Sequence, residues 1–159
     1  MCDLEGELPS VDSSSYRSNL TSPEEWAAIW LRYNSEKRNE DFWAWDELTW
    51  TVADAPERAW PVILELVRQA TDEQLGAIGA GPIEHLVENH VAAFVDRIEA
   101  QVFRDPRFQD ALAAIWLNTW NQEPSLITRI VAASGGQIEP FYLDHDRAER
   151  EGQVPKDGA

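Results

Sequence analysis

The stretch SPEEWAAIWLRY, from Ser22 to Tyr33, carries the strongest structural signal in the chain and predicts an α-helix. Ser22 is a favoured N-cap residue, Pro23 suits the first helical position, and Glu25 supplies the acid of a capping box. Large apolar side chains then recur at helical spacing, and they are Trp26, Ile29, Trp30 and Tyr33. We therefore expect a helix over about residues 23–35.

Similar signals predict further helices along the chain. Pro61 falls one turn inside a predicted helix, so it should kink that helix or delay its start. The segment Gly79 to Pro82 should break the chain between two helices, and residues 138–143 should form a short extended segment. The expected helices cover about 40–53, Pro56 or Pro61 to Ala70, a short one through Ile78, 82–90, 92–103, 106–120 and 126–133.

These elements predict an all-α fold of about six to eight helices. Asp54 to Arg58 and Asp105 to Arg107 each introduce a long apolar helix after a short acidic turn, about 50 residues apart. This spacing favours paired helices in a short HEAT-like stack. Capping signals of this kind are common, however, so a compact helical bundle stays an alternative.

The ordered domain should span residues 22–145. Residues 1–21 are rich in serine and acids and show no helical or strand periodicity, so we expect a flexible acidic tail. Residues 146–159 are charged, and we expect a second flexible tail there. A chain of 159 residues with 43% hydrophobic residues can close a single core.

The chain is strongly acidic, with 29 Asp and Glu against 13 Lys and Arg and a formal net charge of −16 at pH 7. Because no basic footprint is present, we expect no direct binding to nucleic acid or to an anionic membrane. A basic protein partner, or solubility alone, fits this charge better. No apolar stretch approaches the roughly 18 residues that a membrane span requires.

Cys2 is the only cysteine, so neither an internal disulfide nor a cysteine-built zinc site is expected. The first twenty residues also lack the basic and apolar regions of a signal peptide. The cytoplasm is therefore the expected compartment.

Eight tryptophans are a large number for one small domain. We expect most of them to be wedged between helices, because aromatic rings dominate core burial. The alternative is that a few of them line a binding groove. They stand at positions 26, 30, 43, 45, 50, 60, 116 and 120.

The richest polar cluster is EHLVENH, from Glu84 to His90. A helical zinc protease places two histidines four residues apart, whereas His85 and His90 stand five apart, about 140° around the helix axis, and no Glu follows His85. We expect structural roles here. Asp144 and Asp146 would flank the imidazole of His145 with carboxylates, but this group lies at the border of the predicted C-terminal tail, where nothing holds its geometry.

Other chemistry finds no support in the sequence. No Gly-x-Ser-x-Gly elbow is present, and the glycines at 76, 79 and 81 are not followed by the Lys-Ser/Thr pair of a phosphate loop. Gly79 and Gly81 instead permit a tight backbone approach between helices. We expect no catalytic residue, no metal site and no cofactor.

Four segments stand out together: FWAWDEL (42–48), PERAWP (56–61), AGPIEHL (80–86) and DPRF (105–108). They resemble a bacterial domain family of unknown function over about residues 24–120. The Ala-Gly-Pro-(apolar)-Glu-x-Leu segment is the most specific part of this resemblance. The resemblance implies a bacterial helical domain and transfers no catalytic residues.

The leading hypothesis is a non-enzymatic, acidic protein-interaction domain, of inhibitor or immunity-like type, that presents carboxylates to a basic partner. The rival is a small metal-dependent or hydrolytic enzyme that uses Glu and His on helices, although no Glu-x-x-His pair occurs. The oligomeric state stays open, because exposed tryptophans would also suit an oligomer interface. Candidate binding residues are Trp43, Asp46, Glu47, Gly81, Glu84 and His85.

Overall fold

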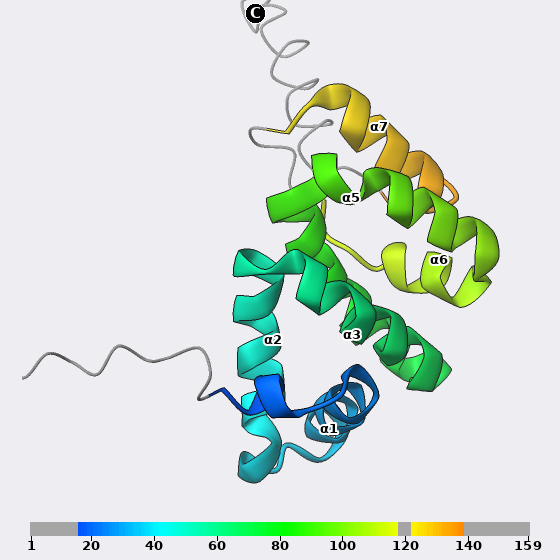
Figure 1. Ribbon diagram of the computed structural model, residues 1–159. Coiled ribbons are helices and arrows are strands. Elements are labelled where there is room, and N and C mark those ends of the chain that lie inside the picture. The colour runs from blue at the N-terminus through cyan, green and yellow to red at the C-terminus, as the bar shows by residue number, and fades with distance from the viewer. Residues whose placement is uncertain (1–15, 118–121, 139–159) are drawn as a thin grey trace, which may run out of the picture.

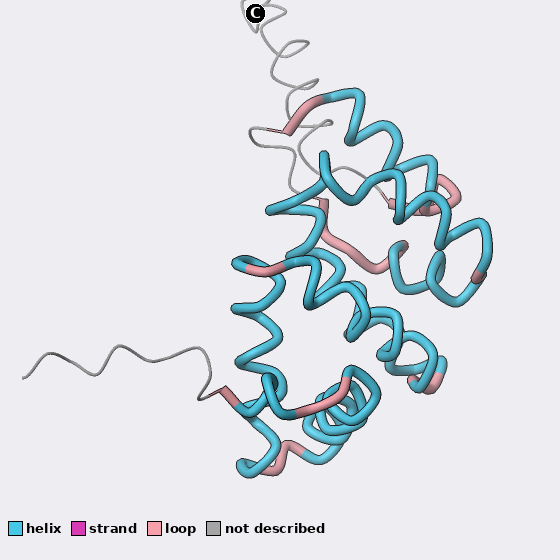
Figure 2. The backbone as a smooth tube through the Cα atoms, viewed as in Figure 1, coloured by secondary structure: helices cyan, strands magenta, loops and turns pink. Residues whose placement is uncertain are grey.

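A computed structural model describes residues 16–117 and 122–138, and within these ranges the fold is all-α, as the sequence predicts. Figure 2 shows helices joined by short loops, without a strand in the described part of the chain. None of the described helices combines the length and the apolar character needed to cross a membrane. The α-helices are α1 (Pro23–Glu36), α2 (Phe42–Asp54), α3 (Pro56–Gln69), α4 (Leu75–Ile78), α5 (Glu84–Arg104), α6 (Pro106–Leu112) and α7 (Pro124–Ala133).

The helices form two three-helix units that lie against each other. In the first unit α1, α2 and α3 all touch one another. In the second unit α4, with the π-helical segment Gly79–Ile83 that follows it, packs on α6, and α5 closes the unit. Figure 1 shows α1 to α3 at the bottom and α5 to α7 at the top; α2 contacts α5 between the units, and α7 covers α5.

In each unit a single residue forms the corner between the last two helices. Ala55, at φ −142° and ψ 64°, separates the end of α2 from Pro56, and Asp105, at φ −138° and ψ 103°, separates α5 from Pro106. Proline fits the first helical position because its missing N–H has no intrahelical acceptor there. The acidic turn that recurs in the sequence therefore marks the same structural corner twice.

Trp26 holds the first unit together. Its side chain is 2% exposed, its Nε1–H donates a hydrogen bond to the carbonyl oxygen of Ala44 at 2.9 Å, and its ring stacks on Trp43 at 6.4 Å between centroids. The guanidinium of Arg58 lies over the same ring at 5.8 Å. One buried indole thus joins α1, α2 and α3, and its single polar atom is satisfied.

Trp60 joins the two units. Its ring on α3 lies 5.7 Å from the ring of Phe94 on α5 and 5.8 Å from that of Phe108 on α6. The expectation that most tryptophans pack between helices holds for Trp26, Trp30, Trp43 and Trp60. Trp45, Trp50 and Trp116 are instead 40%, 64% and 72% exposed, and Trp120 lies outside the described residues.

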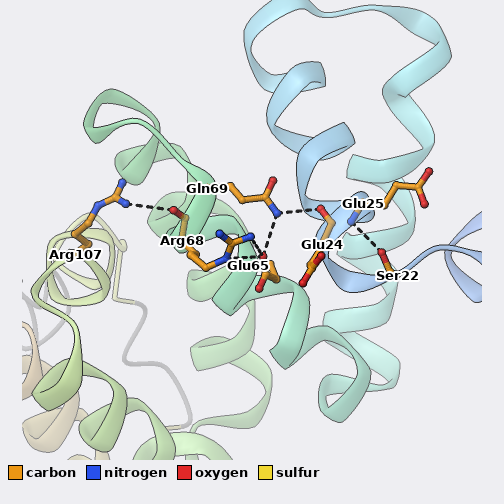
Figure 3. A network of polar contacts seen from close by, with 7 residues as sticks. All are labelled: Ser22, Glu24, Glu25, Glu65, Arg68, Gln69 and Arg107. Carbon is orange, nitrogen blue, oxygen red and sulfur yellow. Dashed lines mark hydrogen bonds and ion pairs between the residues drawn. The ribbon is translucent and has the colours of Figure 1, made fainter.

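A polar network links the ends of three helices (Figure 3). Gln69, at the end of α3, donates to the carbonyl oxygen of Glu24 in α1 at 2.9 Å and to the carboxylate of Glu65. Arg107 of α6 donates to the carbonyl oxygens of Arg68 and Ala70. A cation therefore sits at the C-terminal end of α3, where the last carbonyl groups of the helix lack intrahelical donors.

An ion pair fixes the turn between α1 and α2. Asp41 is 2% exposed, and the guanidinium of Arg32 donates two hydrogen bonds to its carboxylate, at 2.7 and 2.6 Å. This contact lowers the pKa of Asp41 below its usual range, so the carboxylate stays ionised despite its burial.

The structure corrects the expected break at Gly79 to Pro82. The chain runs through these residues as a π-helical segment and continues into α5, with the N–H of Glu84 donating to the carbonyl oxygen of Gly79. Because Pro82 has no N–H, the carbonyl of Ile78 cannot find its usual partner four residues later, and a wider turn absorbs the defect. The helix boundary predicted near His90 corresponds to a kink, where two helical stretches of α5 meet and only His90 lies outside helical dihedral angles, at φ −141° and ψ 25°.

Three other expected boundaries differ. The helix at Pro56 is not delayed, and it runs through Pro61, whose missing N–H removes one hydrogen bond to the carbonyl oxygen of Glu57. The helix predicted over 106–120 ends at Leu112, because Ile115 and Leu117 turn into the core instead, at 6% and 3% exposure. Of the predicted extended segment 138–143, only Ile138 is described.

The predicted N-terminal tail also contains a structured piece. Arg17–Leu20 forms a 3-10 turn, and Ser18 in it is 4% exposed. Residues 1–15 and the range predicted as a C-terminal tail lie outside the described residues.

Two glycines of the α4 region allow a paired test of stability. A Cβ at Gly79 would overlap the backbone carbonyl of Ala111 in α6, whereas a Cβ at exposed Gly76 would meet no atom within 4 Å. We expect Gly79→Ala to lower the free energy of unfolding by about 2 kcal/mol, and Gly76→Ala to raise it by about 0.5 kcal/mol through reduced chain entropy. Urea unfolding of both variants measures this, and equal stabilities would contradict the close packing of α6 on the π-helical segment.

Candidate functional site

The six candidate residues come from three elements, and α2 contacts the other two. Trp43, Asp46 and Glu47 lie on α2, whereas Gly81 lies in the π-helical segment and Glu84 and His85 open α5. Two hollows border α2, and the candidates divide between them. Asp46 and Glu47 line one hollow, and Gly81 and His85 line the other. Trp43 and Glu84 line neither of them.

The first hollow, which we call the acidic groove, lies between α2, the start of α3 and the N-terminal turn, and has a volume of about 530 Å³. It contains three carboxylates and one guanidinium. Two of its aromatic side chains, Trp50 and Tyr16, are 64% and 43% exposed. Its lining consists of Tyr16, Ser18, Asp46, Glu47, Trp50, Thr51, Asp54, Ala55 and Arg58.

Two charged side chains of the acidic groove stabilise the fold through contacts with the N-terminal turn. The carboxylate of Glu47 accepts hydrogen bonds from the backbone N–H groups of Arg17, at 3.2 Å, and Ser18, at 2.8 Å. Arg58 donates to the hydroxyl of Ser18 at 3.2 Å and covers the ring of Trp26. Glu47 therefore has a structural role, because it fixes the N-terminal turn against α2.

The other two carboxylates of the acidic groove have no partner among the described residues. Neither Asp46 nor Asp54 makes a hydrogen bond or an ion pair there, and Trp50 stands between them at a spacing of four residues. Residues four apart share one face of a helix, so α2 presents a row of carboxylate, indole and carboxylate to the groove. Such a row suits a cation, because the indole face and both carboxylates attract positive charge.

The second hollow, which we call the neutral pocket, has a volume of about 250 Å³ and lies on the opposite face of α2. It is closed by α1, α4, the π-helical segment and α5. No Asp, Glu, Lys or Arg lines it. Its lining consists of Trp30, Asn34, Trp45, Leu48, Thr49, Ala77, Ala80, Gly81, Pro82 and His85.

The remaining candidates serve the fold. The half-buried ring of Trp43 stacks on Trp26, and the guanidinium of Arg17 lies over it at 5.9 Å. The carboxylate of Glu84 accepts a hydrogen bond from the backbone N–H of Trp116 at 2.7 Å, so it ties the segment after α6 to the start of α5.

Sequence reasoning missed Trp50 and Asp54 as members of a site. Trp50 entered it only as one of eight tryptophans, and Asp54 only as a capping residue. The spacing of 46, 50 and 54 on a predicted helix is a signal that would have grouped them with Asp46.

The Glu84 to His90 cluster offers one perturbed group. Burial raises the pKa of Glu88 above its usual value, and the neighbouring carboxylate of Glu84 raises it further, while His85 opposes both. A ring nitrogen of His90 lies 2.8 Å from the carbonyl oxygen of Ala53. Among the residues that the structure describes, no group of three His, Cys, Asp or Glu side chains is placed to hold a metal ion. Cys2 and Asp144 to Asp146 lie outside them.

Glu88 gives a pH-dependent prediction. Because its pKa is raised by folding, Glu88 destabilises the fold when ionised, and its contribution is most favourable below the ordinary Glu pKa of about 4.3. We therefore expect Glu88→Gln to be more stable than the original chain at pH 7, with the difference shrinking as the pH falls toward 4.

Thermal unfolding at a series of pH values measures this difference. Glu73→Gln, the same change at an exposed glutamate, is the control. If Glu88→Gln behaved as the control does at every pH, the half-buried environment of Glu88 would not matter to stability.

Comparisons with known proteins yield a family and no activity. The family model described as a family of unknown function, DUF6869, matches residues 32–138, which overlaps the range of the resemblance suggested by the sequence. No curated protein and no solved structure matches the chain. The matched range contains α2 to α7 and most of both hollows. The chain therefore belongs to DUF6869, a family of unknown function.

Proposed function

We propose that this chain is a non-enzymatic interaction domain that binds a basic segment of a partner protein in the acidic groove. The observation that carries this proposal is the row Asp46, Trp50 and Asp54, in which two carboxylates without a described partner flank an indole that is 64% exposed. An arginine or lysine side chain of the partner would lie over the indole and pair with the carboxylates.

The charge of the whole chain supports such a partner. A net charge of −16 attracts a basic protein over a long range and raises its rate of association, and this attraction weakens as salt is added. The same charge opposes direct contact with nucleic acid or anionic lipid. The single cysteine suits a cytoplasmic setting. The inhibitor or immunity-like role and the bacterial origin stay predictions.

The exposed indole of Trp50 would contact the partner directly, and its fluorescence would report the binding. A planar guanidinium can stack on the indole and donate paired hydrogen bonds to a carboxylate, whereas an ammonium offers a point charge only. We therefore expect arginine to be preferred over lysine in the acidic groove. Binding should also change the fluorescence of the protein, because Trp50 would lose contact with water.

One observation favours the rival enzyme hypothesis. Glu88 has a raised pKa, which is a property that general acids share, and Glu84 and His85 stand beside it on α5. The carboxylate of Glu84 is already bonded to Trp116, so this group would need to release that bond to act on a substrate. Metal analysis of the purified protein distinguishes the two, because stoichiometric iron, manganese or zinc would favour the enzyme.

The interaction hypothesis is tested by titrating the protein with a tetra-arginine peptide and following tryptophan fluorescence. We expect Asp46→Asn/Asp54→Asn to weaken binding by about tenfold or more, because two charged contacts are lost. Trp50→Ala should weaken binding and should also remove most of the fluorescence change. Tetra-lysine should bind less tightly than tetra-arginine.

The matched control is Glu73→Gln/Asp110→Asn, which removes the same charge from exposed side chains with no described partner outside the acidic groove. This control should keep most of the affinity, with a slightly weaker dependence on salt. If both double variants lost affinity equally, the peptide would be responding to net charge alone, and the acidic groove would not be the binding site.

A further inference from the structure

We propose that the neutral pocket is a separate binding site for a small, uncharged heteroaromatic molecule. The inference concerns the face of α2 opposite the acidic groove, and it does not depend on a protein partner. Four properties of the neutral pocket carry it: aromatic walls, free polar edges, absence of charge in the lining, and a glycine where a side chain would fill the space.

The walls are aromatic and held in place. Trp30 is 2% exposed and forms a buried wall, while Trp45 is 40% exposed and lines the pocket from α2. The ring of Trp45 rests on Phe42 at 5.7 Å, and Phe42 in turn meets the edge of Tyr33 at 5.7 Å. Because this row of rings supports Trp45, a planar ligand can stack on it with little loss of side-chain freedom.

The polar edges come from Asn34 and His85. Both side chains are partly buried, and neither makes a side-chain hydrogen bond to another described residue. The hydroxyl of Thr49, in contrast, already donates to the carbonyl oxygen of Trp45 at 3.0 Å. An amide offers both a donor and an acceptor, and a neutral imidazole does the same, so together they can pair with the ring nitrogens and amino groups of a heterocycle.

The charge of the lining selects an uncharged ligand. An anion would be repelled by a chain with a net charge of −16 and would find no Lys or Arg in the neutral pocket. A cation would lose its hydration among Leu48, Pro82 and the indoles without gaining a carboxylate, which is costly. At about 250 Å³, the volume lies just below the range of drug-sized sites, so one fused ring system with short substituents fits best.

Gly81 keeps the space open. A Cβ at this position would have as its nearest neighbour the edge of the Trp30 ring, at 4.0 Å, so a longer side chain would extend into the volume next to that wall. Gly81 belongs to the π-helical segment, a distortion found frequently at functional sites. Gly79, two residues earlier, is needed for packing on α6, whereas no such steric demand applies at Gly81.

The test uses adenine and indole as neutral probes, benzamidine as a cation and adenosine monophosphate as an anion. Saturation-transfer NMR and calorimetry on the full chain should detect a neutral probe, with the two charged probes weaker by about tenfold or more. Gly81→Leu should abolish this binding by filling the volume. Gly76→Leu, a matched change at an exposed glycine of the same helical tract outside the pocket, should keep it.

A second variant guards against misfolding of Gly81→Leu, and circular dichroism of each variant reports whether it folds. Asn34→Leu keeps the size of the side chain and removes its hydrogen bonds, so adenine affinity should fall by about tenfold while indole is less affected. The proposal is overturned if neither neutral probe binds the original chain, if benzamidine binds as tightly as they do, or if a folded Gly81→Leu variant binds like Gly76→Leu.

Discussion

The close approach of Gly79 to the backbone of Ala111 is the constraint on which the second half of the molecule depends. Only a residue without a side chain lets α6 rest directly on the π-helical segment, and Pro82 in the same segment forces the wider turn that continues into α5. Since α5 contacts α2, α6 and α7, its direction decides where His85 lies relative to α2. Packing at one glycine thus places one wall of the neutral pocket.

Signals that act within a few residues predicted the structure well. The side chain of Ser22 accepts from the N–H of Glu25, and Asp105 accepts from that of Arg107, as capping requires. The wrong predictions concern helix boundaries that are determined by contacts between residues far apart in the sequence. The segment Gly79 to Pro82 carries every local sign of a break, yet its contact with α6 stabilises a helix, and the chain after Leu112 leaves its helix because Ile115 and Leu117 find room in the core.

The six candidate binding residues stay a prediction, and the structure shows only where each of them lies. Gly81 and His85 line the neutral pocket, where the start of α5 faces α2, whereas Asp46 and Glu47 line the acidic groove on the opposite face of α2. Trp43 and Glu84 turned out to support the fold, which only the positions of Trp26 and Trp116 reveal. An amphipathic pattern shows which face of a helix is apolar and which is polar. It does not show which face meets a partner within the chain and which stays open.

The single-residue corners at Ala55 and Asp105 also limit how the length of this chain can vary. One inserted residue would rotate the following helix by about 100° around its axis, because an α-helix has about 3.6 residues per turn. In α3 this rotation would carry Ile63 and Leu66, both fully buried, away from the core. Insertions and deletions would therefore be harmful at these two corners, where an ordinary surface loop would tolerate them.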